Sequence, residues 1–188
     1  MKDLYDTKYN HLSRADFWIA SSNAVIRHTS IDGALDLRHT FVWGRVDTIE
    51  CQGSGDRLPG TSGCGETERV LIQNMGLSWE DTVALLGAHS LGGGSKDRSG
   101  HKGTWVNGNA EAQVFDKKYY HALMHDSWRP RNFQSDNEDW TTGDNDSRVM
   151  LNTDVSTRCA LLINVTSTLD SYSTTCILLL AVSGIRYQ

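Results

Sequence analysis

Residues 76–94, which read GLSWEDTVALLGAHSLGGG, carry the strongest structural signal in this sequence of 188 residues. Ser78 with Asp81 three positions later is the pattern of a capping box, so a helix is predicted to begin here. Apolar residues then recur at helical spacing, and three glycines end the pattern. The sequence therefore predicts a helix over 78–91, with His89 in its last turn at the edge of an apolar face.

A histidine in this position has two interpretations. It can be a core histidine whose ring nitrogens are bonded by neighbours, or a cation that complements the negative end of the helix dipole. For a lone histidine on an amphipathic helix, either of these structural roles is more common than metal binding. It can also be a metal ligand, because a rigid helix can aim a neutral imidazole into an apolar cavity.

The remaining patterns indicate a mainly α fold. Further helices are predicted over 12–28, 66–75 and 115–126. Ser13 caps the first of these with Asp16 at the third position, and its broad apolar face predicts burial in a helical bundle. Irregular loops are predicted over 29–66, 92–114 and 129–148, and we find no alternating pairs of strands.

Composition and charge exclude several classes of partner. A net charge of −5 without any basic run gives no reason to expect nucleic acid. The longest apolar run, from Cys176 to Val182, is too short to cross a bilayer, so no membrane is expected. The first six residues lack an apolar leader, which favours an intracellular protein with four reduced thiols. Cys51 and Cys64 flank a loop and would pair in an oxidising compartment.

Segments spread from residue 12 to residue 156 resemble the plant-type haem peroxidase superfamily. These segments are SRAD at 13–16, GRVD at 44–47, DRLP at 56–59, DTVALLGAHSLG at 81–92, FDKKYY at 115–120 and MLNTD at 150–154. The last segment, together with Trp105, is similar to the intracellular class, which includes ascorbate peroxidase, cytochrome c peroxidase and catalase-peroxidase. Residues 1–156 are therefore predicted to be haem peroxidase-like, proximal half only, and residues 157–188 form an unassigned tail.

The resemblance implies a specific site. His89 would be the axial ligand of the iron of haem b, with Leu86 and Ser90 beside the cofactor. Asp154 would accept a hydrogen bond from the His89 ring and another from the indole of Trp105, and both would take part in catalysis. From the residues alone, Asp154 is the N-cap of a helix and Trp105 is an ordinary packing residue.

Two further features are expected. A cation would lie near Ser90 and Asp116, although extra residues after Trp105 change the family's spacing here. Arg45 and Asp47 would form a structural ion pair that pins their loop.

The expected activity is reduction of hydrogen peroxide by a small-molecule or protein electron donor. The family's Arg-x-x-(Trp/Phe)-His segment does not occur in this sequence. We therefore expect a chain that covers the proximal half and reacts slowly with peroxide. The alternative is a non-catalytic haem-binding chain or a relic of a peroxidase.

Overall fold

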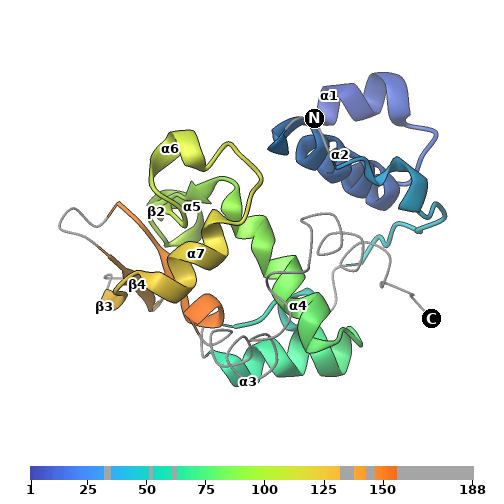
Figure 1. The fold of residues 1–188 in the computed structure, drawn as a ribbon. Coiled ribbons are helices and arrows are strands. Elements are labelled where there is room, and N and C mark those ends of the chain that lie inside the picture. Colours follow the sequence, from blue (N-terminus) through green and yellow to red (C-terminus); the bar gives the residue numbers. More distant parts are fainter. Residues whose placement is uncertain (32–34, 51–52, 61–62, 132–137, 143–146, 156–188) are drawn as a thin grey trace.

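The computed structural model describes residues 1–31, 35–50, 53–60, 63–131, 138–142 and 147–155. Within these ranges helices dominate and strands are short, so the predicted mainly α fold is confirmed (Figure 1). The predicted tail, 157–188, lies outside the described residues, as do Cys51, Cys159 and Cys176. No helix among the residues described has both the length and the apolar character needed to cross a membrane.

The N-terminal part is built around one long helix. Its elements are α1 (Lys2–Leu4), the π-helical η1 (Tyr5–Tyr9), α2 (Arg14–Thr29) and the 3₁₀ turn η3 (Leu37–Thr40). The next 3₁₀ turn, η4 (Ser54–Arg57), contacts residues 68–74 instead. The helix predicted over 12–28 is thus present as α2. Figure 1 shows α1 and α2 together at one end of the molecule, away from α3, α4 and α7.

The first turn of α2 is held by the predicted cap and by a contact that sequence reasoning missed. Ser13 Oγ accepts a hydrogen bond from the backbone N–H of Asp16 at 3.0 Å, as predicted. Asp47 accepts from the N–H groups of Arg14 and Ala15 at 2.8 and 2.9 Å. The unbonded N–H groups at a helix N-terminus attract a carboxylate, and Asp47 supplies it from a distant loop.

The predicted ion pair between Arg45 and Asp47 is wrong. Arg45 Nη1 pairs instead with Asp16 Oδ1 at 2.9 Å. The Asp16 carboxylate also accepts from the N–H of Gly44 at 2.8 Å. Asp16 is buried and needs these partners, whereas Asp47 is used by the helix terminus. The loop is pinned as expected, but to α2 rather than to itself.

The prediction that α2 is buried in a bundle is also wrong for the described residues. Trp18 is 56% exposed and Val25 is 52% exposed. Phe17 is buried, and the rings of Tyr5 and Tyr9 pack on it at centroid distances of 5.1 and 5.6 Å. The apolar residues of α2 occupy a wider arc than its described neighbours η1 and η3 cover.

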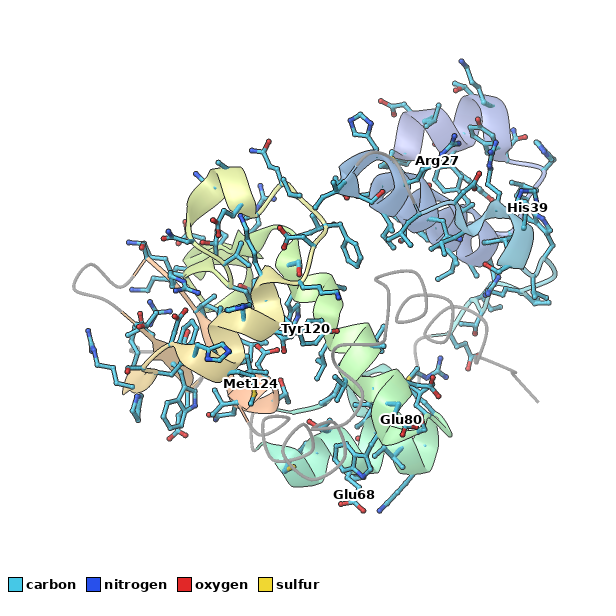
Figure 2. The ribbon with its side chains drawn as sticks, viewed as in Figure 1. Arg27, His39, Glu68, Glu80, Tyr120 and Met124 are labelled. Carbon is cyan, nitrogen blue, oxygen red and sulfur yellow. The ribbon has the colours of Figure 1, made fainter. Side chains whose placement is uncertain are left out.

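The other three predicted helices are present with small changes. They are α3 (Cys64–Thr67) continuing into the π-helical η5 (Glu68–Asn74), α4 (Trp79–Leu86) tightening into the 3₁₀ turn η6 (Gly87–Ser90), and α7 (Lys118–His125). Tyr120 of α7 lies between α7 and α4 (Figure 2), where its hydroxyl donates to the carbonyl of Val83 at 2.9 Å.

Segments that we predicted as loops contain short elements. In 92–114 these are β1 (Gly93–Gly94), α5 (Lys96–Ser99), β2 (Gly103–Thr104) and α6 (Gly108–Glu111). An antiparallel sheet of order β3-β4-β5 joins β3 (Arg129–Arg131), β4 (Asp139–Thr141) and β5 (Met150–Leu151). Strands of two or three residues are too short to show alternation in the sequence.

The largest core lies where α4, α7 and this sheet meet. Its buried members are Val83, Trp105, Val106, Ala112, Tyr119, Tyr120, Ala122, Leu123, Val149 and Met150. This core surrounds the side chains that the sequence singled out as a site.

Candidate functional site

The helix that presents His89 begins at the predicted capping box. Ser78 Oγ accepts from the N–H of Asp81 at 3.0 Å, and Asp81 Oδ2 accepts from the N–H of Ser78 at 3.3 Å. Eight residues of α4 follow before the backbone tightens into η6. His89 therefore lies in the last turn, with its side chain 29% exposed.

Asp154 joins the two ring side chains that the resemblance places beside it. Its Oδ1 lies 2.8 Å from Nδ1 of His89, and its Oδ2 accepts a hydrogen bond from Nε1 of Trp105 at 2.8 Å. The imidazole and indole rings are stacked, with centroids 4.2 Å apart and planes 20° apart. The structure thus brings His89, Trp105 and Asp154 together, although 49 and 65 residues separate Asp154 from its two partners.

The interpretation of Asp154 as a helix N-cap is wrong. Residues 152–155 are helical, so Asp154 is the third residue of that turn and not its cap. Its Oδ2 nevertheless accepts from the N–H of Leu151 at 2.8 Å, as a residue at the third helical position can. One carboxylate serves both the start of the turn and the two aromatic rings.

Tyr119 is a member of this cluster that sequence reasoning missed. Its hydroxyl donates to Oδ1 of Asp154 at 2.8 Å, and its side chain is fully buried. The neighbouring Tyr120 points about 100° away around the helix, towards Val83. The pair of tyrosines at 119–120 was visible in the sequence, but nothing there showed which of them meets Asp154.

Burial and hydrogen bonds set the protonation of this cluster. Burial alone would raise the pKa of the Asp154 carboxyl, but the charge and hydrogen bond of His89 and the N–H groups of Leu151 and Trp105 hold it below its ordinary value. Burial, the charge of Asp154 and the hydrogen bond to it raise the pKa of the Tyr119 hydroxyl well above its ordinary value. Tyr119 is therefore a donor and Asp154 an acceptor across the neutral range.

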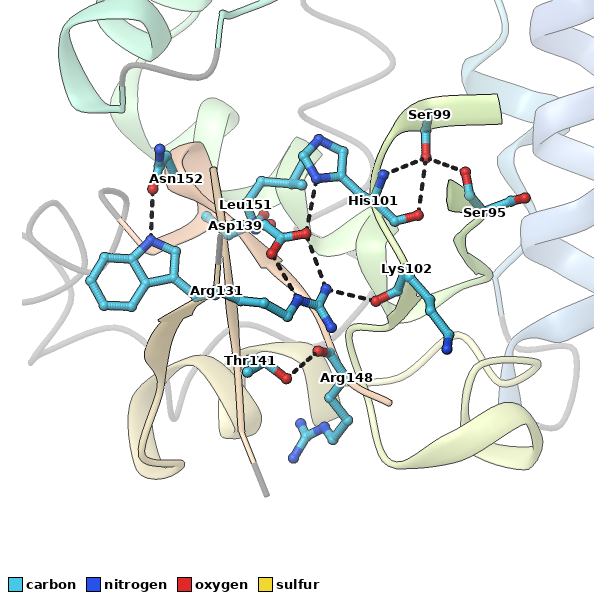
Figure 3. Close-up of polar contacts among 12 residues, drawn as sticks. Ser95, Ser99, His101, Lys102, Arg131, Asp139, Thr141, Arg148, Leu151 and Asn152 are labelled. Carbon is cyan, nitrogen blue, oxygen red and sulfur yellow. Dashed lines mark hydrogen bonds and ion pairs between the residues drawn. The ribbon is translucent and has the colours of Figure 1, made fainter. Parts of the chain in front are cut away.

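A second buried network fixes the segment that leads to Trp105 (Figure 3). His101 Nδ1 lies 3.0 Å from Asp139 Oδ2, and Arg131 Nε donates to Asp139 Oδ1 at 2.9 Å. Arg131 Nη2 also donates to the carbonyl of Lys102 at 2.7 Å. Asp139 lies on β4 and Arg131 on β3, so the sheet holds the backbone three residues before Trp105.

An isolated parallel bridge between Thr104 and Arg148 brings the segment of Asp154 to Trp105. The N–H of Thr104 donates to the carbonyl of Ser147 at 3.1 Å, and the N–H of Val149 donates to the carbonyl of Thr104 at 3.0 Å. The segment that ends at Asp154 thus runs beside the residue that precedes Trp105. Backbone pairing, rather than any local motif, sets the distance between the two side chains.

Leu86 and Ser90 lie near His89 but differ in their surroundings. Leu86 is partly buried and packs against the large core. Ser90 is fully buried, and its hydroxyl donates to the carbonyl of Asp116 at 2.9 Å. Asp116 Oδ1 accepts from the N–H of Lys118 at 2.8 Å, and Lys118 Nζ is 4.0 Å from Asp116 Oδ2. Within the described ranges, no three or more His, Cys, Asp or Glu side chains form a group that could hold a metal ion.

The chemistry of this donor set fits a haem iron. Among the described residues, the hydrogen bond of the His89 ring is the one at Nδ1, to Asp154, so Nε2 has no partner there. A carboxylate behind one ring nitrogen is the usual second partner of a histidine that binds metal through the other. The His89 side chain is 29% exposed, so the surrounding core does not enclose it completely.

Comparison with known proteins agrees with this geometry. The sequence model of the family described as "Peroxidase" matches residues 1–159. The mitochondrial cytochrome c peroxidase of Emericella nidulans is 31% identical over 124 residues, which cover 66% of this chain and 32% of that protein. The cytosolic L-ascorbate peroxidase 2 of Oryza sativa subsp. japonica is 40% identical over 114 residues, covering 60% of this chain and 42% of the relative.

A putative heme-binding peroxidase of Candida albicans is 27% identical over 152 residues, covering 79% of this chain and 49% of that protein. The chain thus spans less than half the length of each of these relatives. The family match covers most of the chain and includes His89, Trp105 and Asp154. The chain therefore belongs to the plant-type haem peroxidase family.

Proposed function

We propose that this chain forms the His89 side of a haem b site in a peroxidase that reduces hydrogen peroxide with a small-molecule or protein electron donor. The observation that carries the proposal is the Asp154 carboxylate, which contacts Nδ1 of His89 and Nε1 of Trp105 at 2.8 Å each. Membership of the peroxidase family supports the same reaction.

Each side chain has a distinct role in the proposal. His89 would hold the iron through Nε2, and Asp154 would keep the ring proton on Nδ1 so that the Nε2 lone pair is available. A bound haem would supply the redox chemistry that peroxide reduction needs. Leu86 and Ser90 would lie beside the cofactor on the same helical segment.

Trp105 is the side chain that we propose to exchange an electron with the donor. Its indole stacks on the His89 ring at 4.2 Å, and its N–H is held by the buried Asp154 carboxylate. A nearby negative charge stabilises positive charge that develops on the indole. The contact therefore both orients Trp105 and favours its oxidised form.

A cation beside Ser90 and Asp116 is a separate element of the proposal. The Asp116 carboxylate and carbonyl would be its oxygen ligands. The carboxylate already accepts from the backbone of Lys118, and the Lys118 ammonium is 4.0 Å away, which opposes a second positive charge. Unchanged thermal unfolding on adding Ca²⁺ or K⁺ would remove the cation from the proposal.

The test is a titration of the chain with hemin, followed by its absorption band near 400 nm. We expect a saturable spectral change that His89→Ala abolishes. His121→Ala is the matched control, because His121 is exposed on α7 and makes no bond to Asp154. Hemin binding that survives His89→Ala would refute the ligand assignment.

The catalytic part is measured separately with the loaded chain. Oxidation of ascorbate and of reduced cytochrome c by hydrogen peroxide should depend on His89 and decrease in Asp154→Asn. Binding through His89 with no turnover of either donor would identify a non-catalytic haem-binding chain.

A further inference from the structure

We propose that Tyr119 is a positioning residue for His89: its hydroxyl shares one oxygen of Asp154 with the imidazole and thereby weakens the hydrogen bond between Asp154 and His89. The inference deepens the proposed function and rests on it for its haem-dependent measurement alone. Its first measurement uses the haem-free chain, so the two can fail independently.

The acceptor sites of the Asp154 carboxylate are fully used. Oδ1 is hydrogen-bonded to His89 Nδ1 and to the Tyr119 hydroxyl, both at 2.8 Å. Oδ2 receives the N–H groups of Trp105 and Leu151, both at 2.8 Å. An ionised carboxylate offers about four acceptor positions, so each donor here competes with three others for one negative charge.

Tyr119 differs from the other donors because it addresses the same oxygen as His89. Two donors on one oxygen each withdraw electron density that the other would use, whereas Trp105 and Leu151 act on the second oxygen. The Tyr119 hydroxyl is therefore the donor whose position weakens the hydrogen bond between His89 Nδ1 and Asp154 Oδ1.

The ring of Tyr119 has packing that does not need the hydroxyl. It packs edge-on against the rings of Tyr120 and His89, with ring centroids 5.1 and 6.0 Å away. A phenylalanine at this position would keep both contacts. What the hydroxyl adds is the bond to Asp154, which is also the bond that acts on His89.

Removing the hydroxyl should strengthen the bond between His89 and Asp154. The Nδ1 proton is then drawn further towards the carboxylate, which gives the ring more imidazolate character. A more basic ring donates more electron density to a metal at Nε2 and lowers the metal's reduction potential. Tyr119 thus sets an upper limit on this donation.

The first experiment measures the ¹⁵N shift of His89 Nδ1 in the haem-free chain labelled with [¹⁵N]histidine, detected through the carbon-bound ring protons. Tyr119→Phe should move this signal towards the value of a deprotonated ring nitrogen. Tyr120→Phe is the matched control, because it also deletes a buried tyrosine hydroxyl, but one that donates to the carbonyl of Val83. The control should leave the signal in place.

A second variant keeps the hydroxyl, and therefore the fold. 3-Fluorotyrosine at position 119 has a more acidic hydroxyl, which is a stronger donor, so the His89 signal should move in the opposite direction. Equal shifts in Tyr119→Phe and Tyr120→Phe, or no response to either change at position 119, would overturn the proposal.

The second experiment uses the haem-loaded chain and measures the reduction potential of the iron. Tyr119→Phe should make the potential more negative, and Tyr120→Phe should not. A purely structural role of Tyr119 would lower stability without these opposite and selective shifts. If the chain fails to bind hemin, the proposed function fails, while the nitrogen shifts still decide the role of Tyr119.

Discussion

Gly87 provides the sharpest prediction on how the His89 helix packs. It is buried at the junction of α4 and η6, and its φ of −58° is an ordinary right-handed value. Any residue can adopt this backbone, so steric space alone requires glycine here. A Cβ at this position would lie 2.2 Å from the Tyr120 hydroxyl oxygen and 2.9 Å from Cζ.

The expected cost of Gly87→Ala follows from three contributions. Overpacking a buried site costs about 1–3 kcal/mol. Displacing Tyr120 also loses its hydrogen bond to Val83, worth about 1 kcal/mol. The higher helix propensity of alanine returns about 1 kcal/mol. We therefore expect Gly87→Ala to lower the free energy of unfolding by about 1–3 kcal/mol.

The assay is urea unfolding followed by tryptophan fluorescence and circular dichroism. Gly65→Ala is the control, because Gly65 is exposed in α3 and a Cβ there meets nothing within 4 Å. The control should leave stability unchanged or raise it by up to about 1 kcal/mol. Tyr120→Phe in the Gly87→Ala background removes the clashing oxygen but not Cζ, so it should cost less than it does alone. Equal effects at Gly87 and Gly65, or strict additivity with Tyr120→Phe, would refute the steric argument.

Two further predictions concern the N-terminal cap of α4 and the Asp154 carboxylate that contacts His89. Ser78→Ala removes the acceptor of the capping box and should lower the free energy of unfolding by about 1 kcal/mol, whereas Ser78→Gly should cost only a few tenths, both measured by urea unfolding. Equal losses for the two variants would contradict the capping role. The pKa of Asp154 is lowered on folding, so the unfolded chain binds more protons than the folded chain at acid pH. The contribution of the Asp154 carboxylate to folding stability is therefore complete above the unfolded pKa near 3.9 and is lost as the pH falls below that value. The difference in stability between wild type and Asp154→Asn should therefore shrink from pH 6 to pH 3; a constant difference would contradict the shift.

The helices could be predicted because their signals are local. The capping box at Ser78 and the cap at Ser13 are both present in the structure, and each depends on residues three positions apart. The burial of α2 could not be predicted, because periodicity shows which residues share a face and not what covers that face. The ion pair of Arg45 was misassigned because its partner Asp16 is 29 residues away and no local pattern connects them.

The candidate site shows the same division between local and distant information. His89 could be placed from its own helix, and Trp105 and Asp154 from the family resemblance. Their convergence depends on the backbone hydrogen bonds of Thr104 with Ser147 and Val149, which form an isolated bridge that no sequence pattern marks. Tyr119 illustrates the remaining limit: adjacent tyrosines on a helix point about 100° apart, and only the packing of α7 determines which hydroxyl reaches the carboxylate. The family motif thus accounts for three members of the cluster, and the fourth, which shares an oxygen with His89, follows from tertiary structure alone.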